Sequence, residues 1–477
     1  MRKKGSVTVF LTLILSLLLS LICASIESVR MASARTQILN GMDIGLYSLF
    51  GQYDKELLTD YDLFALDGSR GDGQLDLAAV CDELEAYMNP VLKQNSQKLT
   101  LCQSGLTGYR LLTDQKGEAF YQQIVGYMQE TLGSQGIQLL LGRMSERQEK
   151  TAQADQSANQ AQSKGSIDRY DSEMNQASEK SQQAAEEAQV VPQTPPAKNP
   201  ITIMKRIMKR GVLELVLPGG NGLSTKESEK GTLVSGRGLQ QGMEMPDGMT
   251  VENSYTSEVL FQQYLMEHLG SYAEPSSTGL AYQVEYIFGG KDSDEDNLKA
   301  VASKLLFIRE GVNFACLMAD NVKRSEAQAL ATAIASGFLV PPAAVIIEAA
   351  LILCWAFAES VLDVRELFAG GRIPLVKSSG DWQISLENLP DLMEGLDSMR
   401  RNDEKGMSYK DYLQVLVLTV SKEKKVMRAM DMIENTIREK GRKNFCMDSC
   451  IVALEAFADV KANKKKDFQV IRQYCYE

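Results

Sequence analysis

The sequence predicts an α+β protein that is held in a membrane by its N-terminus. Three observations predict this class: a long apolar run at the start, helical periodicity over most of the chain, and short alternating stretches near the C-terminus. Helical and strand patterns occur in the same body, which is typical of α+β proteins. We therefore expect an N-terminal transmembrane helix that continues into a long helix, a mixed helical body with small antiparallel sheets, and a polar, partly helical spacer.

The composition narrows the functional classes. The 477 residues are 44% hydrophobic and 24% charged, as is ordinary for a globular protein. The net charge of −11 argues against a nucleic-acid binder, which needs a basic surface to displace counterions from phosphates. A single histidine excludes a metal site with two histidine ligands.

The first residues are typical of a membrane anchor. Arg2, Lys3 and Lys4 precede a charge-free run from Gly5 to Ile26, and about 20 helical residues cross the hydrocarbon core of a bilayer. The basic cluster comes first, so we expect residues 1–5 to be a cytosolic leader, 6–27 to be a single transmembrane helix and the body to be extracytoplasmic. Signal-peptidase cleavage and lipid attachment at Cys23 are alternatives. A retained anchor is favoured, because the flanking residues suit neither reaction.

The apolar pattern continues beyond the membrane towards Leu49 and Phe50. This predicts one long helix, although an anchor followed by a separate short helix fits the same residues. Small side chains where the helix leaves the membrane allow close approach of other helices. We expect that packing face at Ala24, Ser25, Ser28 and Ala32.

Two segments follow the anchor. Residues 28–145 are expected to form an N-terminal extracytoplasmic α+β region, with a strand at Leu99–Cys102 between helices. Residues 146–200 have a low-complexity composition rich in Gln, Ala, Ser, Glu and Lys, which predicts a polar, partly helical spacer with little packing. A solvent-exposed polar helix is the alternative.

Residues 201–477 are expected to form a C-terminal extracytoplasmic α+β body. Alternation predicts a strand at Tyr282–Phe288, and the acids from Asp292 predict a helix start. Residues 412–437 are expected to be helical. Two hairpins are predicted, one from Ile373–Val376 with Trp382–Leu386 and one from 450–456 with 468–476 around a basic turn at 464–466.

The apolar stretch at 327–362 fits either a buried helical hairpin or a second membrane span. Pro341 and Pro342 interrupt it, and Glu348 would lie at membrane depth, where a carboxylate is costly. Burial is therefore favoured.

No residue pattern identifies a catalytic centre, a metal site or a cofactor site. His268 precedes Gly270 and is interpreted as a helix-terminal residue. Asp292, Asp294 and Asp296 match only the opening of a calcium loop, so a capped helix start is preferred. Seven cysteines lie outside the anchor, and Cys81–Cys102 or Cys450–Cys475 are conceivable disulfides in an oxidising compartment.

The segment Lys4-Gly5-Ser6-Val7-Thr8-Val9-Phe10 resembles the start of TadE/TadG-like pseudopilins, minor components of tight-adherence pilus and type II-like secretion systems. The resemblance implies leader-peptidase cleavage after Gly5, with Ser6 as the first mature residue. Phe10 stands where prepilins usually carry a glutamate. The rest of the chain resembles an uncharacterised domain family that is encoded near such loci in Gram-positive anaerobes. That resemblance is carried by stretches 60–64, 289–298, 354–364, 373–377 with Trp382, and 408–413.

We therefore expect a non-enzymatic, outward-facing assembly protein without a cofactor or small-molecule substrate. The expected partners are the lipid bilayer and pilin-like or secretion-apparatus membrane proteins, and not nucleic acid. One alternative is a carboxylate-only surface enzyme, such as a cell-wall glycoside hydrolase, that uses Glu348, Glu359 and Asp363. In the structural interpretation of these acids, Glu359 and Asp363 pair with Arg365 or cap neighbouring strands. A cell-wall spacer or adhesin is the third possibility.

Overall fold

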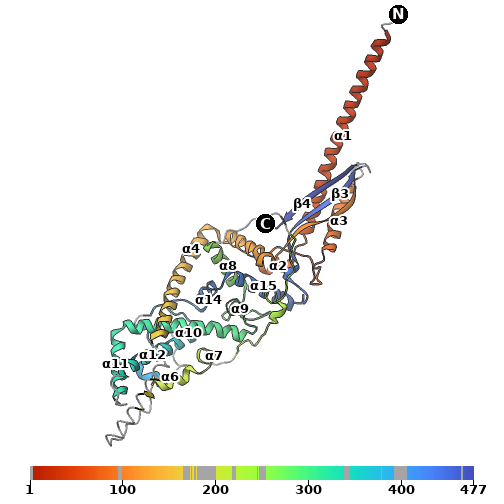
Figure 1. Ribbon diagram of the computed structural model, residues 1–477. Helices are drawn as coiled ribbons and strands as arrows, with labels where there is room; N and C mark the ends of the chain where they lie inside the picture. The colour runs from red at the N-terminus through yellow and green to blue at the C-terminus, as the bar shows by residue number, and fades with distance from the viewer. Residues whose placement is uncertain are drawn as a thin grey trace. The chain divides into compact units, whose positions relative to one another are not determined.

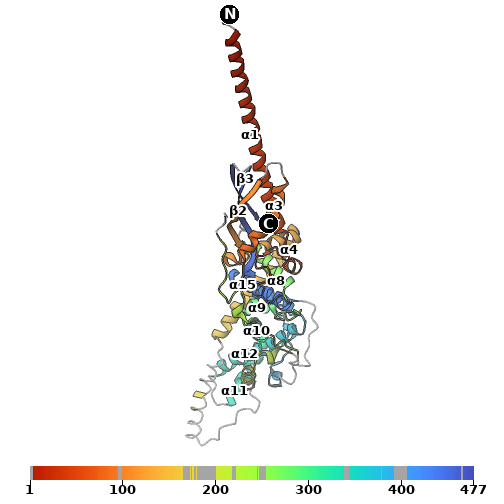
Figure 2. The same cartoon turned by 90° about the vertical axis from the view of Figure 1, so that its right-hand side faces the viewer.

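The computed structural model describes residues 4–94, 99–164, 172, 175–176, 179, 200–217, 222–243, 245, 254–337, 343–377, 379–391, 406–462 and 466–476 (Figures 1 and 2). The chain divides into two compact units. The first comprises Met1–Tyr127, Gly231–Glu252 and Ile437–Glu477, and the second comprises Met128–Lys230 and Asn253–Thr436. The α+β class predicted from the sequence is confirmed.

The first unit combines helices with one antiparallel sheet. Strand β3 is the centre of this sheet, with β2 along one side and β1 and then β4 along the other. The predicted C-terminal hairpin is therefore confirmed as β3 and β4, although Lys464 and Lys465 lie outside the described residues. The elements of the first unit are α1 (Lys4–Phe50), α2 (Lys55–Tyr61), β1 (Leu66–Asp67), α3 (Leu77–Lys93), β2 (Leu99–Leu111), β3 (Cys450–Ala462) and β4 (Lys466–Cys475).

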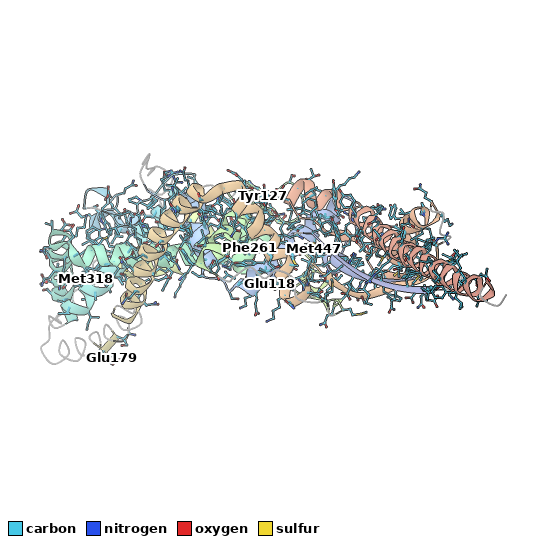
Figure 3. All side chains as sticks on the ribbon, turned by 90° about the horizontal axis from the view of Figure 1, so that it is seen from above. Glu118, Tyr127, Glu179, Phe261, Met318 and Met447 are labelled. Atoms are coloured by element: carbon cyan, nitrogen blue, oxygen red, sulfur yellow. The ribbon has the colours of Figure 1, made fainter. Side chains whose placement is uncertain are left out.

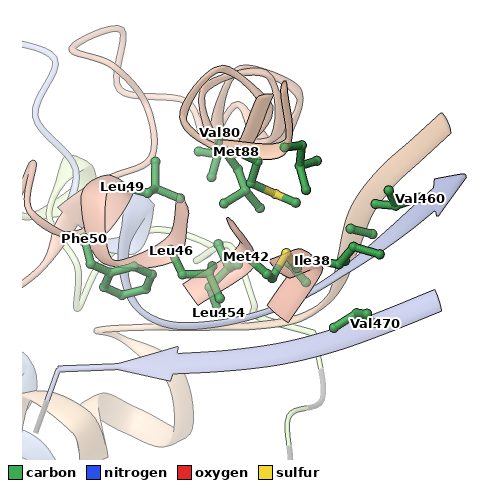
Figure 4. Close-up of a cluster of buried hydrophobic side chains, with 14 of the residues drawn as sticks. Ile38, Met42, Leu46, Leu49, Phe50, Val80, Met88, Leu454, Val460 and Val470 are labelled. Atoms are coloured by element: carbon green, nitrogen blue, oxygen red, sulfur yellow. The ribbon is translucent and has the colours of Figure 1, made fainter. Parts of the chain in front are cut away.

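Helix α1 is one continuous helix of 47 residues, as the apolar pattern predicts. Its C-terminal half packs into the core of the first unit, where it contacts α3 and one face of the sheet (Figure 4). A Cβ atom at Gly45 would lie 2.6 Å from Met88 Cγ, so the two helices approach closely there. The buried α1 side chains include Ala34, Ile38, Met42, Leu46, Leu49 and Phe50.

The second unit is helical. Helices α10 and α12 form its centre through buried residues such as Leu305 and Trp355. Phe261, which is labelled in Figure 3, is buried in the same unit. Two of the four boundaries between the units fall within α4 and α15. The elements are α4 (Asp114–Lys164), α6 (Pro200–Met208), α7 (Val212–Val216), α8 (Tyr255–His268), α9 (Gln283–Gly289), α10 (Asp294–Ala319), α11 (Asn321–Gly337), α12 (Ala344–Phe368), α14 (Tyr409–Leu418) and α15 (Lys422–Glu439), with short 3-10 turns at Ser379–Asp381 and Leu386–Asp391.

Three secondary-structure predictions for this unit need correction. Tyr282–Phe288 is not a strand, because residues 283–289 form helix α9, which ends at Gly290 in the left-handed conformation with φ 62°. The helix is buried on all sides from Gln283 to Ile287, so its sequence does not show helical periodicity. The described residues of 373–386, which do not include Ser378, form no hairpin ladder, and Ile373 instead bridges Met407. The helix predicted for 412–437 is two helices, α14 and α15.

The predicted spacer begins as part of a packed helix. Helix α4 continues to Lys164, and its Thr151, Ala154 and Ala158 are buried. A Cβ atom at Gly311 of α10 would lie 2.3 Å from Ala158, so small side chains on both helices allow contact between their backbones. The expectation of little packing is therefore wrong for this part. Alanine-rich composition is typical of a solvated helix, but it also permits close helix packing.

Candidate functional site

The N-terminal half of α1 is apolar and has no protein neighbours within the described chain. Side chains from Val7 to Arg30 are exposed, with Phe10 63% and Leu17 67% accessible. The most apolar part of this helix is entirely exposed. An apolar surface of this size is unfavourable in water. The helix is therefore a candidate membrane anchor or signal sequence.

Polar groups within the bare segment are satisfied inside the helix. The hydroxyl groups of Thr12, Ser16 and Ser20 each donate to the carbonyl oxygen three residues earlier, at distances of 2.9, 2.9 and 3.3 Å. Every backbone and hydroxyl group must find such a partner in lipid, because no water is available there. The segment therefore meets this requirement without help from another chain.

The structure brings the predicted packing residues to one side of α1. At about 100° per residue, Ala24, Ser25, Ser28 and Ala32 fall within a sector of roughly 100°. All four are exposed, and Ser25 Oγ donates to the Leu21 carbonyl at 2.8 Å. Gly5 and Ser6, the predicted processing site, lie in the first turns of the same helix.

A second helix, α12, is also long and apolar enough to span a bilayer. However, 78% of its most apolar stretch is buried inside the protein. Leu351, Cys354, Trp355 and Ala358 are among its buried side chains. This burial agrees with the predicted buried hairpin at 327–362 and identifies α12 as a core helix of the second unit.

A charged network lies inside the second unit beside α12. Asp363 Oδ2 accepts from Arg309 Nε at 3.0 Å, Arg309 Nη2 at 2.9 Å and Asn313 Nδ2 at 3.0 Å. Asp363 Oδ1 lies 2.6 Å from Lys377 Nζ, which also pairs with Glu359. All four charged side chains are buried, and their two positive and two negative charges balance. The network joins α10, α12 and the segment after α12.

The same network bonds to backbone groups at both ends of the segment 374–384, where a hairpin ladder was predicted. Arg309 Nη1 donates to the carbonyl oxygens of Pro374 and Leu375 at 3.0 and 2.9 Å. Glu359 Oε2 accepts from the backbone N–H of Ile384 at 3.1 Å, and Trp355 Nε1 donates to the Ile384 carbonyl at 2.7 Å. Buried backbone groups need partners. Here charged and aromatic side chains replace a neighbouring strand.

Opposing effects set the ionisation of Asp363. Burial by itself would raise the pKa of its carboxyl group, but the charges of Arg309 and Lys377 outweigh burial and lower that pKa. Burial likewise opposes the charge on Arg309, while Asp363 raises the pKa of the guanidinium. We interpret Asp363 and Arg309 as ionised at neutral pH.

The three acids considered for catalysis are all engaged in ion pairs. Glu359 and Asp363 belong to the buried network, and Glu348 Oε1 lies 3.3 Å from Arg324 Nε. Arg365, the partner considered in the sequence, donates to the Leu215 carbonyl at 3.1 Å. The structural interpretation of Glu359 and Asp363 fits their geometry, but with Arg309 and Lys377 as the pairing cations.

A further buried acid, Glu285 of α9, was not singled out in the sequence. Its Oε1 accepts from Tyr409 Oη at 2.6 Å and from the Tyr272 backbone N–H at 2.8 Å. The Tyr272 and Tyr409 rings pack at 5.9 Å beside it, and burial raises the pKa of Glu285 to about 7. The only signal in the sequence is an acid between Val284 and Tyr286 in an otherwise apolar run.

The remaining sequence predictions have clear outcomes. His268 is the last residue of α8 and stacks on Tyr264 with ring centroids 4.0 Å apart, which confirms its helix-terminal position. Ser293 caps α10 and Asp294 is buried, which confirms the capped start. Within the described residues, no cluster of three potential ligands could hold a metal ion.

The two conceivable disulfides are wrong, because all eight cysteines are thiols in the structure. The register of the C-terminal hairpin shows why one of them does not form. Cys475 on β4 lies opposite Ala453 on β3, whereas Cys450 is at the start of that strand and pairs with Asp67 of β1.

Comparison with known proteins gives one match. No curated protein and no solved structure matches the chain. Residues 191–462 match a family described as a family of unknown function, DUF5702. These residues include the second unit from α6 onward and, from the first unit, residues 231–252 and 437–462, which contain strand β3. The match covers more than half of the sequence, and the chain therefore belongs to the DUF5702 family.

Proposed function

We propose that the protein is a membrane-anchored, outward-facing assembly component, similar to a minor pseudopilin, of a Tad-type pilus or secretion apparatus. One observation carries the proposal. Helix α1 is bare and apolar over about the thickness of a bilayer and is then buried in the core of the first unit without a break. The anchor and the core of the first unit thus share one continuous helix.

The direction of insertion follows from charge. Lys4 and the basic residues before it precede the bare segment, which favours a cytosolic N-terminus and a single crossing. The second candidate span, α12, is occupied in the protein core, so it needs no lipid. Both considerations support an extracytoplasmic body.

The proposed role in assembly rests on the exposed small-residue face and on the pseudopilin-like leader. Small residues let two helices approach closely in lipid, where van der Waals contacts replace the hydrophobic effect as the attraction. Ser28 and its neighbours on that face are exposed, so a pilin-like membrane helix could pack there. Partner recruitment would then occur where the helix leaves the bilayer, next to the folded body.

Labelling of intact cells tests the sidedness. Cys475 is exposed on β4, and Cys354 is buried in α12. A membrane-impermeant maleimide is expected to modify Cys475 in intact cells and to leave Cys354 unmodified until the protein is denatured. Peptide mass spectrometry reads the two thiols separately in the unaltered protein. Modification of Cys475 only after lysis would place the body in the cytosol and refute the proposal.

Site-specific photocrosslinking tests the partner. A photoreactive residue at Ser28 is expected to capture a pilin-like or secretion-apparatus membrane protein in living cells. Ile26 lies about 160° around the same helix at a similar depth and provides the matched control position. Capture of the same proteins from both positions, or of lipid alone from Ser28, would rule out the small-residue face as the docking surface.

A further inference from the structure

The depth at which α1 leaves the bilayer can be estimated from its sequence. The apolar stretch from Val7 to Ile26 is roughly 30 Å long at 1.5 Å per residue, which matches the hydrocarbon core. Arg30 lies about 6 Å further along the helix, and its side chain is exposed. In a membrane, Arg30 would therefore lie at the level of the lipid headgroups.

The described residues nearest the turn of the β3–β4 hairpin lie near the same level. Arg472 of β4 pairs with Asp43 of α1 at 2.9 Å, which aligns the strand with the helix at that point. Further along, Phe50 contacts Tyr474 and Tyr476, so α1 and β4 run in the same direction. From Arg472 back to Lys466 the strand covers roughly 20 Å. From Asp43 back to Arg30 the helix also covers roughly 20 Å.

This end of the first unit is basic although the whole chain carries a net charge of −11. Arg30 and Arg35 of α1 and Lys461 and Lys466 of the hairpin are exposed and form what we call the basic rim. Lys461 lies 3.7 Å from Asp467, with both side chains about half exposed or more, so this pair is weak. Within the described residues, the other three have no ion pair. The acids near this level are Glu27 of α1 and, on the hairpin, Asp459 and Asp467, so the four basic side chains exceed them by one.

We infer that the basic rim binds the phosphate groups of anionic lipids at the outer surface of the bilayer. This inference rests on the membrane placement proposed above and adds the lipid class as a partner. Exposed lysine and arginine side chains near an anionic bilayer are attracted to it, and the attraction decays within a Debye length of about 10 Å. The hairpin would thereby be held against the membrane beside the anchor helix.

Lipid selectivity of the full-length protein in reconstituted bilayers tests this inference. Spin-labelled phosphatidylglycerol is expected to associate with the wild-type protein about 3-fold more strongly than spin-labelled phosphatidylcholine at low salt. The preference should fall towards 1 in 0.5 M NaCl, because salt screens exposed charges. The double variant Lys461→Gln with Lys466→Gln should lose most of it at low salt.

Lys93 provides the matched control. It is exposed at the end of α3, where its neighbour Leu92 packs beside Gly41 of α1, and it therefore lies roughly 16 Å beyond Arg30. The variant Lys93→Gln makes the same kind of substitution, with one positive charge removed instead of two, and should keep the wild-type selectivity. Equal association of the two lipids with an incorporated wild-type protein would overturn the basic rim alone. Failure of the protein to incorporate into bilayers would overturn the anchor proposal as well.

Discussion

Replacing Asp363 with alanine is expected to destabilise the second unit by about 3–5 kcal/mol. The carboxylate bonds Arg309, Asn313 and Lys377 within the protein interior. Its removal leaves two buried cations with one acid, Glu359, to balance them, and an unpaired buried charge is far more costly than a missing pair. Urea unfolding followed by tryptophan fluorescence measures the loss. Both tryptophans of the sequence, Trp355 and Trp382, pack together at 5.9 Å beside the network.

Glu348 on the same helix provides the control for this prediction. Its ion pair with Arg324 is partly exposed, so Glu348→Ala should cost about 1 kcal/mol or less. The double variant Arg309→Met with Asp363→Leu removes one charge of each sign and should recover part of the stability lost in Asp363→Ala. Losses of similar size in Asp363→Ala and Glu348→Ala would mean that the network is not a determinant of stability.

The stability of the second unit is expected to fall as the pH rises from about 4.5 to about 7. Burial raises the pKa of Glu285 to about 7 in the folded protein, above its ordinary value of 4.5. The folded state therefore binds more protons than the unfolded state in this window. The contribution of Glu285 to the free energy of unfolding is fully present below pH 4.5 and is lost as the pH rises through 7. It amounts to about 3 kcal/mol. Urea unfolding at several pH values measures this slope.

The variant Glu285→Gln isolates this contribution, because its amide does not titrate. Glu310 has its pKa raised to about 7 by burial as well, so the wild-type profile contains both groups. The difference in unfolding free energy between wild type and Glu285→Gln should change by about 3 kcal/mol between pH 4.5 and pH 8. A difference that stays constant across this range would show that Glu285 is ionised in the folded protein.

Local patterns were sufficient for part of this structure. The charge-free run predicted the bare half of α1, and the alternating tail predicted β3 and β4, because each signal lies within one element. The buried apolar segment was also predictable, since Glu348 and the two prolines argue against a membrane span. These features depend on hydrophobic periodicity and length, which a single sequence displays directly.

The partners of the buried acids were not predictable in the same way. Asp363 bonds to Arg309, which is 54 residues away in the sequence. Glu359 pairs with Lys377, which lies on a segment without regular structure. The alternation at 373–386 suggested strands, but the backbone there bonds to Arg309 and Glu359 instead of to another strand. Nothing local distinguishes these two arrangements, because the choice depends on how α10 and α12 pack.

The packed half of α1 is synthesised long before the strands that cover it. Its apolar face, with Ile38, Met42 and Leu46, is covered in part by β3 and β4, which follow roughly 400 residues later in the chain. At 5–20 residues per second, a ribosome needs on the order of 20–80 s to produce them. During that interval the core of the first unit cannot be completed, because β3 and β4 are missing. We therefore expect nascent chains to depend on a chaperone outside the membrane, and truncations that lack the last two strands to be degraded rather than to accumulate.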